Sequence, residues 1–432
     1  MLILKNAKLL TMAEGPRYTE GDIAVEDGKI SAVGKLENGC FLTEAGSMAL
    51  TGDAAVENFS GCVILPGLFD CHVHYDYDFM GDYFLAGGVT SVRNMSGNKE
   101  HARFRDEILA GKRTGPCIYS SGPIVDGEDP TLVNNDHFIL RTEEDAEKAI
   151  EYTKKYSFIW MKTYPSIEPD IYRYLMKRCR EEKLPLCGHM TKKMDYRELA
   201  EGGYICCEHT SSLPSDLAVV KELAEAGMWL CPTHVVCETM PDYVWNGKQL
   251  SSLERYDDLP GFVQFEWERN NREIIESYHK YNIHPDFDEV TRRGQTFVEY
   301  SSPDRIMAGT DCPYPGMIPG CALTDELERL VRVYGLSPYE ALCAATVNPA
   351  RHIGIENLKG SLKAGMDSDM IVVRGDPLAC VTDVKNIVKV FLGTRSFTAD
   401  ELQARLDRDK MLTPDKVEMI TGADRENRNV GR

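Results

Sequence analysis

Two histidines, His72 and His74, stand at the end of an apolar run that is typical of a β-strand. Side chains alternate between the two faces of a strand, so residues two positions apart point the same way. Two imidazoles on one face can hold a single divalent metal ion. The run 65–74 therefore predicts one part of a metal site.

Other polar residues follow further apolar runs along the chain: Lys162, His189, His209 and Asp311. In a barrel of parallel strands, active residues lie where the strands end, on the carboxyl face. Each of these residues stands at such an end. The separations from Lys162 to His189 and from His189 to His209 are 27 and 20 residues, each about one helix plus one strand. We therefore expect them to meet His72 and His74 in one site.

Lys162 needs its own explanation, because an ammonium group has no lone pair for a metal. Burial in a cation-rich site lowers the pKa of a lysine. The neutral amine can then add carbon dioxide, and the carbamate that forms has two oxygens that can bridge two ions. In this interpretation His72 and His74 hold one divalent ion, while His189 and His209 hold the other.

Asp311 lies in the run Ala308-Gly309-Thr310-Asp311 and has the chemistry of a proton carrier. A bound dication lowers the pKa of water to about 7, so a metal-bridging hydroxide forms near neutral pH. Asp311 would ligate one ion, accept the proton as the hydroxide attacks a carbonyl, and pass it to the leaving amine. The alternatives are a helix N-cap for Asp311, and for Lys162 an ion pair with Asp311 or a contact to a substrate carboxylate.

The elements that must position these residues are strands alternating with helical stretches over residues 66–355, which indicates βα units. Eight strands are predicted, the number in a closed (β/α)8 barrel. They are Cys62–Phe69, Gly88–Val92, Cys117–Ser121, Phe158–Met161, Pro185–Cys187, Tyr204–Cys207, Trp229–Pro232 and Arg305–Ala308. Residues 241–300 read as a long, mostly helical insertion before the last strand.

The two ends of the chain have a different pattern from the barrel. Residues 1–65 read as short strands with turns, and residues 356–397 return to strand character. We expect these two segments to pair into one small β-sandwich domain that is discontinuous in sequence. Residues 398–432 are charged and predict one helix and a tail. The predicted fold class is thus α/β, a TIM-like barrel with a small β domain.

Composition narrows the function classes. The 432-residue chain has 68 acidic and 49 basic residues and a net charge of −19, which argues against a nucleic-acid partner. No apolar run approaches the roughly 20 residues of a membrane span. Its 14 cysteines are scattered, as expected for reduced thiols in the cytoplasm. We expect a cytoplasmic homo-oligomer that acts on a small molecule.

These motifs together resemble the amidohydrolase superfamily, in the branch of imidazolonepropionase-like proteins and Xaa-Pro dipeptidases. The resemblance rests on segments along nearly the whole chain: Pro66–His74, Gly88–Arg93, Ile159–Tyr164, Gly188-His189, Glu208-His209, Gly309–Asp311, Leu336–Ala350, Gly360–Val373 and Asp376–Leu378. It implies a binuclear site, most often zinc, and hydrolysis of an amide or related bond. The residues alone leave the metal open, because imidazole and carboxylate ligands suit several ions.

Four residues are candidates for contact with the substrate: Arg93, His137, Tyr164 and His234. The planar fork of Arg93 suits a substrate carboxylate, although a structural ion pair is an equal alternative. His137 has the chemistry to donate to a scissile carbonyl, with a surface-loop histidine as its alternative. Tyr164 and His234 stand at strand ends, where packing is the alternative role.

Three functions follow from these observations. The first is an enzyme that cleaves an amide bond in a peptide or an N-acyl amino acid. The second is a hydrolase of cyclic amides, lactones or esters on the same binuclear site. The third is a binding protein on an enzyme fold, which would require the loss of ligands. No predicted ligand is missing, so the sequence favours a hydrolase.

Overall fold

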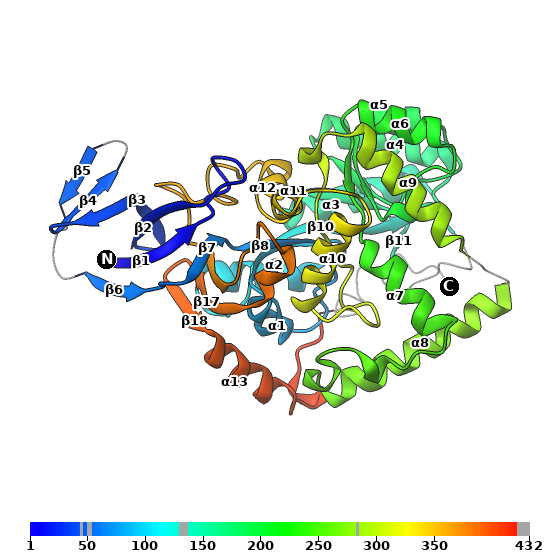
Figure 1. Cartoon of the computed structure of the whole chain (residues 1–432). Helices are drawn as coiled ribbons and strands as arrows, with labels where there is room; N and C mark the ends of the chain where they lie inside the picture. Colours follow the sequence, from blue (N-terminus) through cyan, green and yellow to red (C-terminus); the bar gives the residue numbers. More distant parts are fainter. Residues whose placement is uncertain (44–45, 50–53, 129–136, 282–284, 421–432) are drawn as a thin grey trace.

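The computed structural model describes residues 1–43, 46–49, 54–128, 137–281 and 285–420, arranged around two sheets (Figure 1). The first sheet contains β1 (Leu2–Leu9), β2 (Thr19–Glu26), β3 (Lys29–Glu37), β4 (Cys40–Thr43), β5 (Gly46–Ala49), β6 (Ala55–Asn58), β7 (Cys62–Pro66), β16 (Met370–Arg374), β17 (Ile387–Leu392) and β18 (Arg395–Thr398). The second contains β8 (Leu68–Val73), β9 (Val89–Asn94), β10 (Cys117–Asp126), β11 (Phe138–Ile139), β12 (Trp160–Thr163), β13 (Leu186–Gly188), β14 (Tyr204–Glu208) and β15 (Trp229–Cys231).

Helices surround the second sheet and connect its strands (Figure 1). They are α1 (Met80–Ala86), α2 (Lys99–Leu109), α3 (Glu143–Lys155), α4 (Pro169–Glu181), α5 (Tyr196–Glu201), α6 (Leu217–Glu225), α7 (His234–Val244), α8 (Gly261–Tyr281), α9 (Phe287–Tyr300), α10 (Cys321–Arg332), α11 (Pro338–Ala344), α12 (Val347–Ile353) and α13 (Ala399–Asp409). In Figure 1 strands β1–β6 of the first sheet lie to the left, and most of the helices lie to the right. Helix α13 packs against β17 and β18 of the first sheet.

The second sheet is a parallel barrel. Its strands pair in the order β8, β9, β10, β12, β13, β14 and β15. A short segment closes the circle: the Met307 N–H donates to the Leu230 carbonyl at 2.9 Å, and the Cys71 N–H donates to the Ala308 carbonyl at 2.8 Å. The predicted TIM-like barrel is therefore confirmed, with its eighth strand reduced to this closing segment.

The first sheet joins the two ends of the chain. Strand β16 lies between β7 and β17 and runs antiparallel to both. Strands from the C-terminal part thus complete a sheet that the N-terminal strands begin, as the sequence pattern predicted for the small β domain.

The single strand predicted at Cys62–Phe69 is wrong, because the chain changes sheets in its middle. Strand β7 ends at Pro66 in the first sheet, and β8 begins at Leu68 in the barrel. A Cβ at Gly67 would lie 2.2 Å from Oγ1 of Thr90, so only glycine allows this close approach. An apolar run gives no sign of such a crossing, because both strands are buried.

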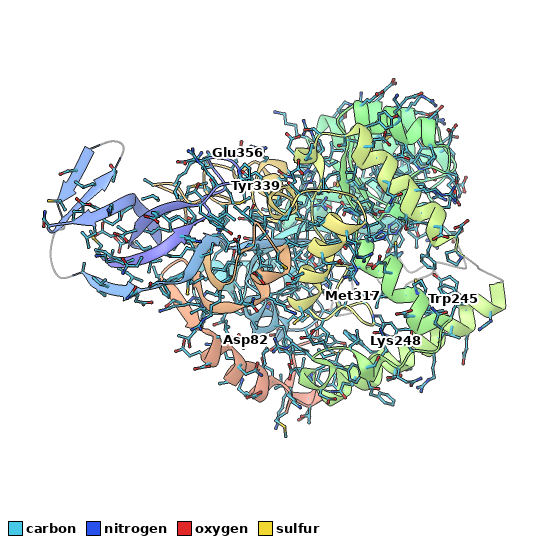
Figure 2. All side chains as sticks on the ribbon, in the orientation of Figure 1. Asp82, Trp245, Lys248, Met317, Tyr339 and Glu356 are labelled. Carbon is cyan, nitrogen blue, oxygen red and sulfur yellow. The ribbon has the colours of Figure 1, made fainter. Side chains whose placement is uncertain are left out.

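The helical insertion begins earlier than predicted, since α7 already starts at His234. Its long helix α8 packs on the loop that follows β8, with the rings of Phe262 and Tyr77 5.8 Å apart. At the other end of the chain, α13 is tied to α1 by Asp82, which accepts hydrogen bonds from Arg405 and Arg408 (Figure 2). Residues 421–432 of the predicted tail lie outside the described residues. Among the described helices, none has the length and apolar character to cross a membrane.

Candidate active site

The carboxyl ends of the barrel strands bring the predicted ligands together. His72 lies in β8, Lys162 in β12, and His189 and His209 directly follow β13 and β14. The ring of His209 is 4.4 Å from that of His72 and 4.6 Å from that of His189, measured between centroids. Parallel strands that end on one face place these side chains side by side although they are far apart in sequence.

Asp311 completes the cluster from the closing segment of the barrel. Its Oδ1 lies 3.4 Å from Nε2 of His72 and 3.3 Å from Nε2 of His74. The potential ligand atoms of His72, His209 and Asp311 all lie within 4.8 Å of one another. His72 and His74 thus face the same carboxylate, an arrangement that could hold one divalent ion.

Two ligand candidates have left-handed backbones. His209 has a φ of 66° and Asp311 a φ of 62°, which is uncommon for residues other than glycine. The His209 N–H donates to the Cys231 carbonyl at 2.9 Å and the Asp311 N–H to the His72 carbonyl at 2.7 Å, so neighbouring segments hold both turns. The turn at His209 breaks the alternation of the strand, and the adjacent Glu208 and His209 side chains both reach His72.

Lys162 is completely buried, and its Nζ has no hydrogen-bond partner among the described residues. Burial lowers the pKa of Lys162. Two imidazole nitrogens, Nε2 of His72 and Nδ1 of His189, are also buried without a hydrogen-bond partner in the described part of the chain, although Nε2 of His72 lies 3.4 Å from Oδ1 of Asp311. Buried polar atoms are nearly always hydrogen-bonded or ligated. These three atoms therefore fit a site that takes up further ligands, and a carbamate with divalent ions meets that need.

The imidazoles of His72, His189 and His209 have the protonation state of ligands. Burial lowers the pKa of His72 and His189 well below the ordinary value, and that of His209 to about 4. Burial opposes ionisation of Asp311, yet the facing imidazoles of His209 and His74 hold its pKa below the usual range. Near neutral pH the site thus offers imidazole lone pairs and one carboxylate, the donors that zinc and related ions prefer.

The cluster has two aromatic neighbours that were predicted as substrate contacts. The ring of Tyr164 lies 4.2 Å from His189 and 4.7 Å from His137, edge to face in both cases. Nδ1 of His137 lies 3.6 Å from Oδ2 of Asp126, and both side chains are buried. Tyr164 therefore lies beside the predicted ligand His189, and His137 lies on Tyr164. Residues 129–136, which lead to His137, are outside the described part of the chain.

Comparison with known proteins now identifies the family. The model of the amidohydrolase family matches residues 63–396, well over half of the chain. This chain belongs to the amidohydrolase family. Enamidase of Eubacterium barkeri is 24% identical over 400 residues, which cover 88% of this chain and 88% of the relative. Imidazolonepropionase of Serratia proteamaculans is 21% identical over 403 residues, covering 84% and 89%.

Solved structures of similar fold agree with this assignment. Ochratoxinase of Aspergillus niger superposes with a TM-score of 0.66 at 18% identity and covers 92% of this chain and 95% of its own. A Xaa-Pro dipeptidase with bound methionine superposes with a TM-score of 0.67 at 17% identity, covering 92% and 99%. At these identities the likeness concerns the barrel fold of the amidohydrolase, while its chemistry depends on the residues of the site.

Arg93 of this amidohydrolase lies in the barrel interior and not at the mouth. It is completely buried, its Nη1 donates to Oε1 of Glu208 at 2.6 Å, and its guanidinium stacks 4.6 Å above the ring of Trp160. Of the two roles left open by the sequence, this placement favours the structural ion pair. The predicted contact to a substrate carboxylate has no support from it.

Replacing Arg93 by methionine is expected to destabilise the protein by about 3–5 kcal/mol, because Glu208 would keep a buried charge without its partner. Urea denaturation of the purified variant measures this change. Arg173→Met is the matched control, since its ion pair with Glu198 is exposed and its loss should cost within about 1 kcal/mol. Equal stabilities of the two variants would contradict a structural role for Arg93.

His234 has partners outside the predicted ligands. Its Nδ1 hydrogen-bonds with the hydroxyl of Tyr334 at 2.8 Å, and its Nε2 lies 3.9 Å from Oε1 of Glu238. It lines a surface hollow between α7, α9 and the end of α10. The structure thus gives His234 protein partners of its own, and it does not support the predicted contact with substrate.

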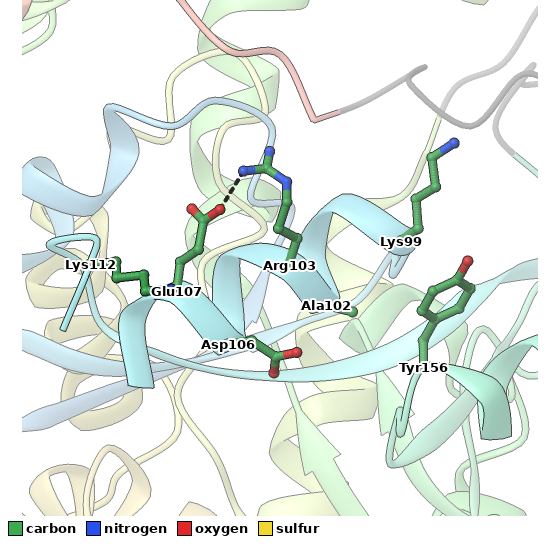
Figure 3. A pocket seen from close by; sticks show the side chains of 7 residues that line it. All are labelled: Lys99, Ala102, Arg103, Asp106, Glu107, Lys112 and Tyr156. Carbon is green, nitrogen blue, oxygen red and sulfur yellow. Dashed lines mark hydrogen bonds and ion pairs between the residues drawn. The ribbon is translucent and has the colours of Figure 1, made fainter. Parts of the chain in front are cut away.

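Another hollow on the surface is lined mainly by charged side chains. It lies on α2 and is lined by Lys99, Ala102, Arg103, Asp106, Glu107, Lys112 and Tyr156 (Figure 3). Arg103 and Glu107 pair with each other at 2.7 Å. The hollow contains none of the predicted ligands, so we assign it no role.

Sequence reasoning missed three residues that support the cluster. Glu208 accepts a hydrogen bond from Nδ1 of His72 at 2.7 Å, and Oγ1 of Thr233 hydrogen-bonds with Nδ1 of His209 at 2.7 Å. Asp70 accepts from the Thr310 hydroxyl at 2.7 Å, and burial raises its pKa to about 7. A carboxylate inside an apolar strand was the available signal for Asp70 and Glu208. Thr233 offered none.

Proposed function

We propose that this chain is a binuclear metal-dependent amidohydrolase that cleaves an amide bond in a peptide or an N-acyl amino acid. The observation that supports it most strongly is a group of buried nitrogens, on Lys162, His72 and His189, that have no hydrogen-bond partner among the described residues. Nε2 of His72 also lies 3.4 Å from the Asp311 carboxylate. A soluble scaffold has no reason to bury three such atoms together, because each costs free energy until it finds a partner.

In this proposal His72 and His74 hold one divalent ion, and His189 and His209 hold the other. Lys162, as its carbamate, would supply ligand oxygens to both, and Asp311 lies beside His72 and His74. Zinc is the expected ion. When bound, the ions lower the pKa of a shared water to about 7 and polarise the substrate carbonyl.

The side chains carry out the proton transfers. Asp311 is the general base, because it remains ionised and its Oδ1 lies 3.4 Å from Nε2 of His72 and 3.3 Å from Nε2 of His74. It takes a proton from the attacking water and returns it to the nitrogen of the leaving amine. His137, held near Asp126, would donate a hydrogen bond to the carbonyl oxygen as negative charge develops on it.

One observation favours the second function, hydrolysis of a cyclic amide, lactone or ester. A peptide or an N-acyl amino acid carries a carboxylate, and Arg93, its predicted partner, is committed to Glu208. The similar proteins do not favour one of the two functions. They include a Xaa-Pro dipeptidase and an ochratoxinase, and also an enamidase and a dihydroorotase of Pyrococcus furiosus that is 31% identical over 130 residues.

A substrate panel separates these proposals. Zinc-loaded enzyme in bicarbonate buffer is tested on dipeptides, N-acyl amino acids, cyclic amides, lactones and esters. Turnover of dipeptides or N-acyl amino acids, lost in Asp311→Asn, is the expected result. Turnover of cyclic amides, lactones or esters alone would replace the first proposal by the second. A chain that binds no divalent metal would contradict both. A cytoplasmic location and a homo-oligomeric state remain predictions from the sequence.

A further inference from the structure

Three buried side chains form a series of hydrogen bonds that ends at His72, one of the predicted metal ligands. Arg93, Glu208 and His72 each have no exposed surface. Nη1 of Arg93 donates to Oε1 of Glu208 at 2.6 Å, and Oε2 of Glu208 lies 2.7 Å from Nδ1 of His72. The series therefore connects a permanent positive charge in the barrel interior to a nitrogen of the first histidine.

This series of hydrogen bonds fixes which nitrogen of His72 carries the proton. An ionised carboxylate only accepts hydrogen bonds, so Nδ1 of His72 must be the donor. Nε2 is then left with a lone pair, and it is the nitrogen that lies 3.4 Å from Oδ1 of Asp311. Arg93 supplies the charge that keeps the fully buried Glu208 ionised.

We propose that Glu208, backed by Arg93, is a positioning residue that holds His72 in the tautomer and orientation needed to bind a divalent ion. The inference rests on the proposed function, because it takes His72 as a metal ligand. Supporting carboxylates of this kind affect metal affinity by about 10–100-fold. Glu208, His72 and Cys231 also lie close enough to hold an ion themselves, but the guanidinium of Arg93 on the same carboxylate opposes a second cation there.

Glu208→Gln tests the tautomer directly. The charged guanidinium of Arg93 takes the amide oxygen, which turns the amide NH2 toward Nδ1 of His72. Nδ1 must then accept, so the proton moves to Nε2 and blocks the lone pair meant for the metal. We expect zinc affinity to fall by about 10–100-fold.

A double variant distinguishes positioning from simple damage. In Glu208→Gln/Arg93→Met the guanidinium is gone, so the amide oxygen is free to accept from Nδ1 of His72 and restore the original tautomer. We expect its zinc affinity to exceed that of Glu208→Gln by about tenfold, within the range given above. If the two changes only damaged the barrel, the double variant would bind zinc no better than the single one.

The readouts are the zinc dissociation constant, measured by chelator competition, and the ¹⁵N shifts of the His72 ring in the metal-free protein. Asp82→Asn is the matched control, because Asp82 is a largely buried carboxylate that pairs with arginines of α13. Its zinc affinity should equal that of the wild type. Should Glu208→Gln fail to fold, Glu208→Leu/Arg93→Met replaces it, and it should bind zinc more weakly than the Gln/Met double variant.

The outcomes separate the inference from the function on which it rests. A wild-type chain that binds no zinc overturns the proposed function. A wild type that binds zinc, with unchanged affinity and an unchanged His72 tautomer in Glu208→Gln, overturns the inference alone. Equal zinc affinity in the Gln/Met and Leu/Met double variants overturns it as well.

Discussion

Asp311→Asn is expected to lower kcat by about 10²–10⁴-fold, the usual contribution of general acid–base catalysis. Asparagine has nearly the same shape as aspartate, but its amide cannot take a proton from the attacking water. The pKa of Asp311 lies below the usual range, so the wild-type carboxylate is ionised at every working pH. The measurement is kcat on the substrate found in the panel, together with the zinc content of the variant.

The control for this result is Asp304→Asn. Asp304 lies shortly before the closing segment, is partly exposed and is 3.9 Å from Arg351, so its loss should leave kcat unchanged. The zinc content decides between two causes: loss of kcat with full zinc indicates a role in proton transfer, and loss of both indicates a role as ligand. A kcat of Asp311→Asn equal to that of the wild type would remove Asp311 from the mechanism.

Lys162→Ala is expected to lower kcat by at least about 100-fold, because a bridging ligand should matter no less than the side chains that merely support ligands. The variant should also lose bound zinc. Alanine leaves space in the buried site, so acetate or propionate, which supply a carboxylate in place of the carbamate, should restore part of the activity. Activity and zinc content are measured with and without these acids.

Lys193→Ala is the matched control for Lys162→Ala, because Nζ of Lys193 pairs with Glu168 at a half-exposed position. It should keep full activity and show no response to acetate. The wild type offers an independent test: enzyme freed of metal and carbon dioxide should regain activity with zinc only when bicarbonate is present. Full recovery without bicarbonate would contradict the carbamate and favour the other roles considered for Lys162.

The sequence predicted the architecture well because its signals are local. Alternating strands and helices indicated the barrel, and the predicted strand Tyr204–Cys207 agrees with β14, which spans Tyr204–Glu208. The one large error in the strands, the run Cys62–Phe69, arose because the crossing at Gly67 depends on contact with Thr90. That contact is invisible in a single apolar segment.

The sequence by itself predicted that the six candidate metal ligands lie close together. His72 and His74 stand two positions apart at the end of a strand, so their side chains point the same way. Lys162, His189, His209 and Asp311 also stand at predicted strand ends, and parallel strands of a barrel end on one face. These rules depend only on spacing along the chain.

Only the tertiary structure decided what each side chain contacts. Arg93 and His234 stand at strand ends like the ligand candidates, yet Arg93 pairs with Glu208 and His234 with Tyr334. The left-handed turn at His209 brings Glu208 to His72, which regular alternation would not predict. The direction of a side chain depends on local backbone angles, and its partner on packing between segments about a hundred residues apart. Neither the direction nor the partner of a side chain can be predicted from the spacing of residue types along the chain.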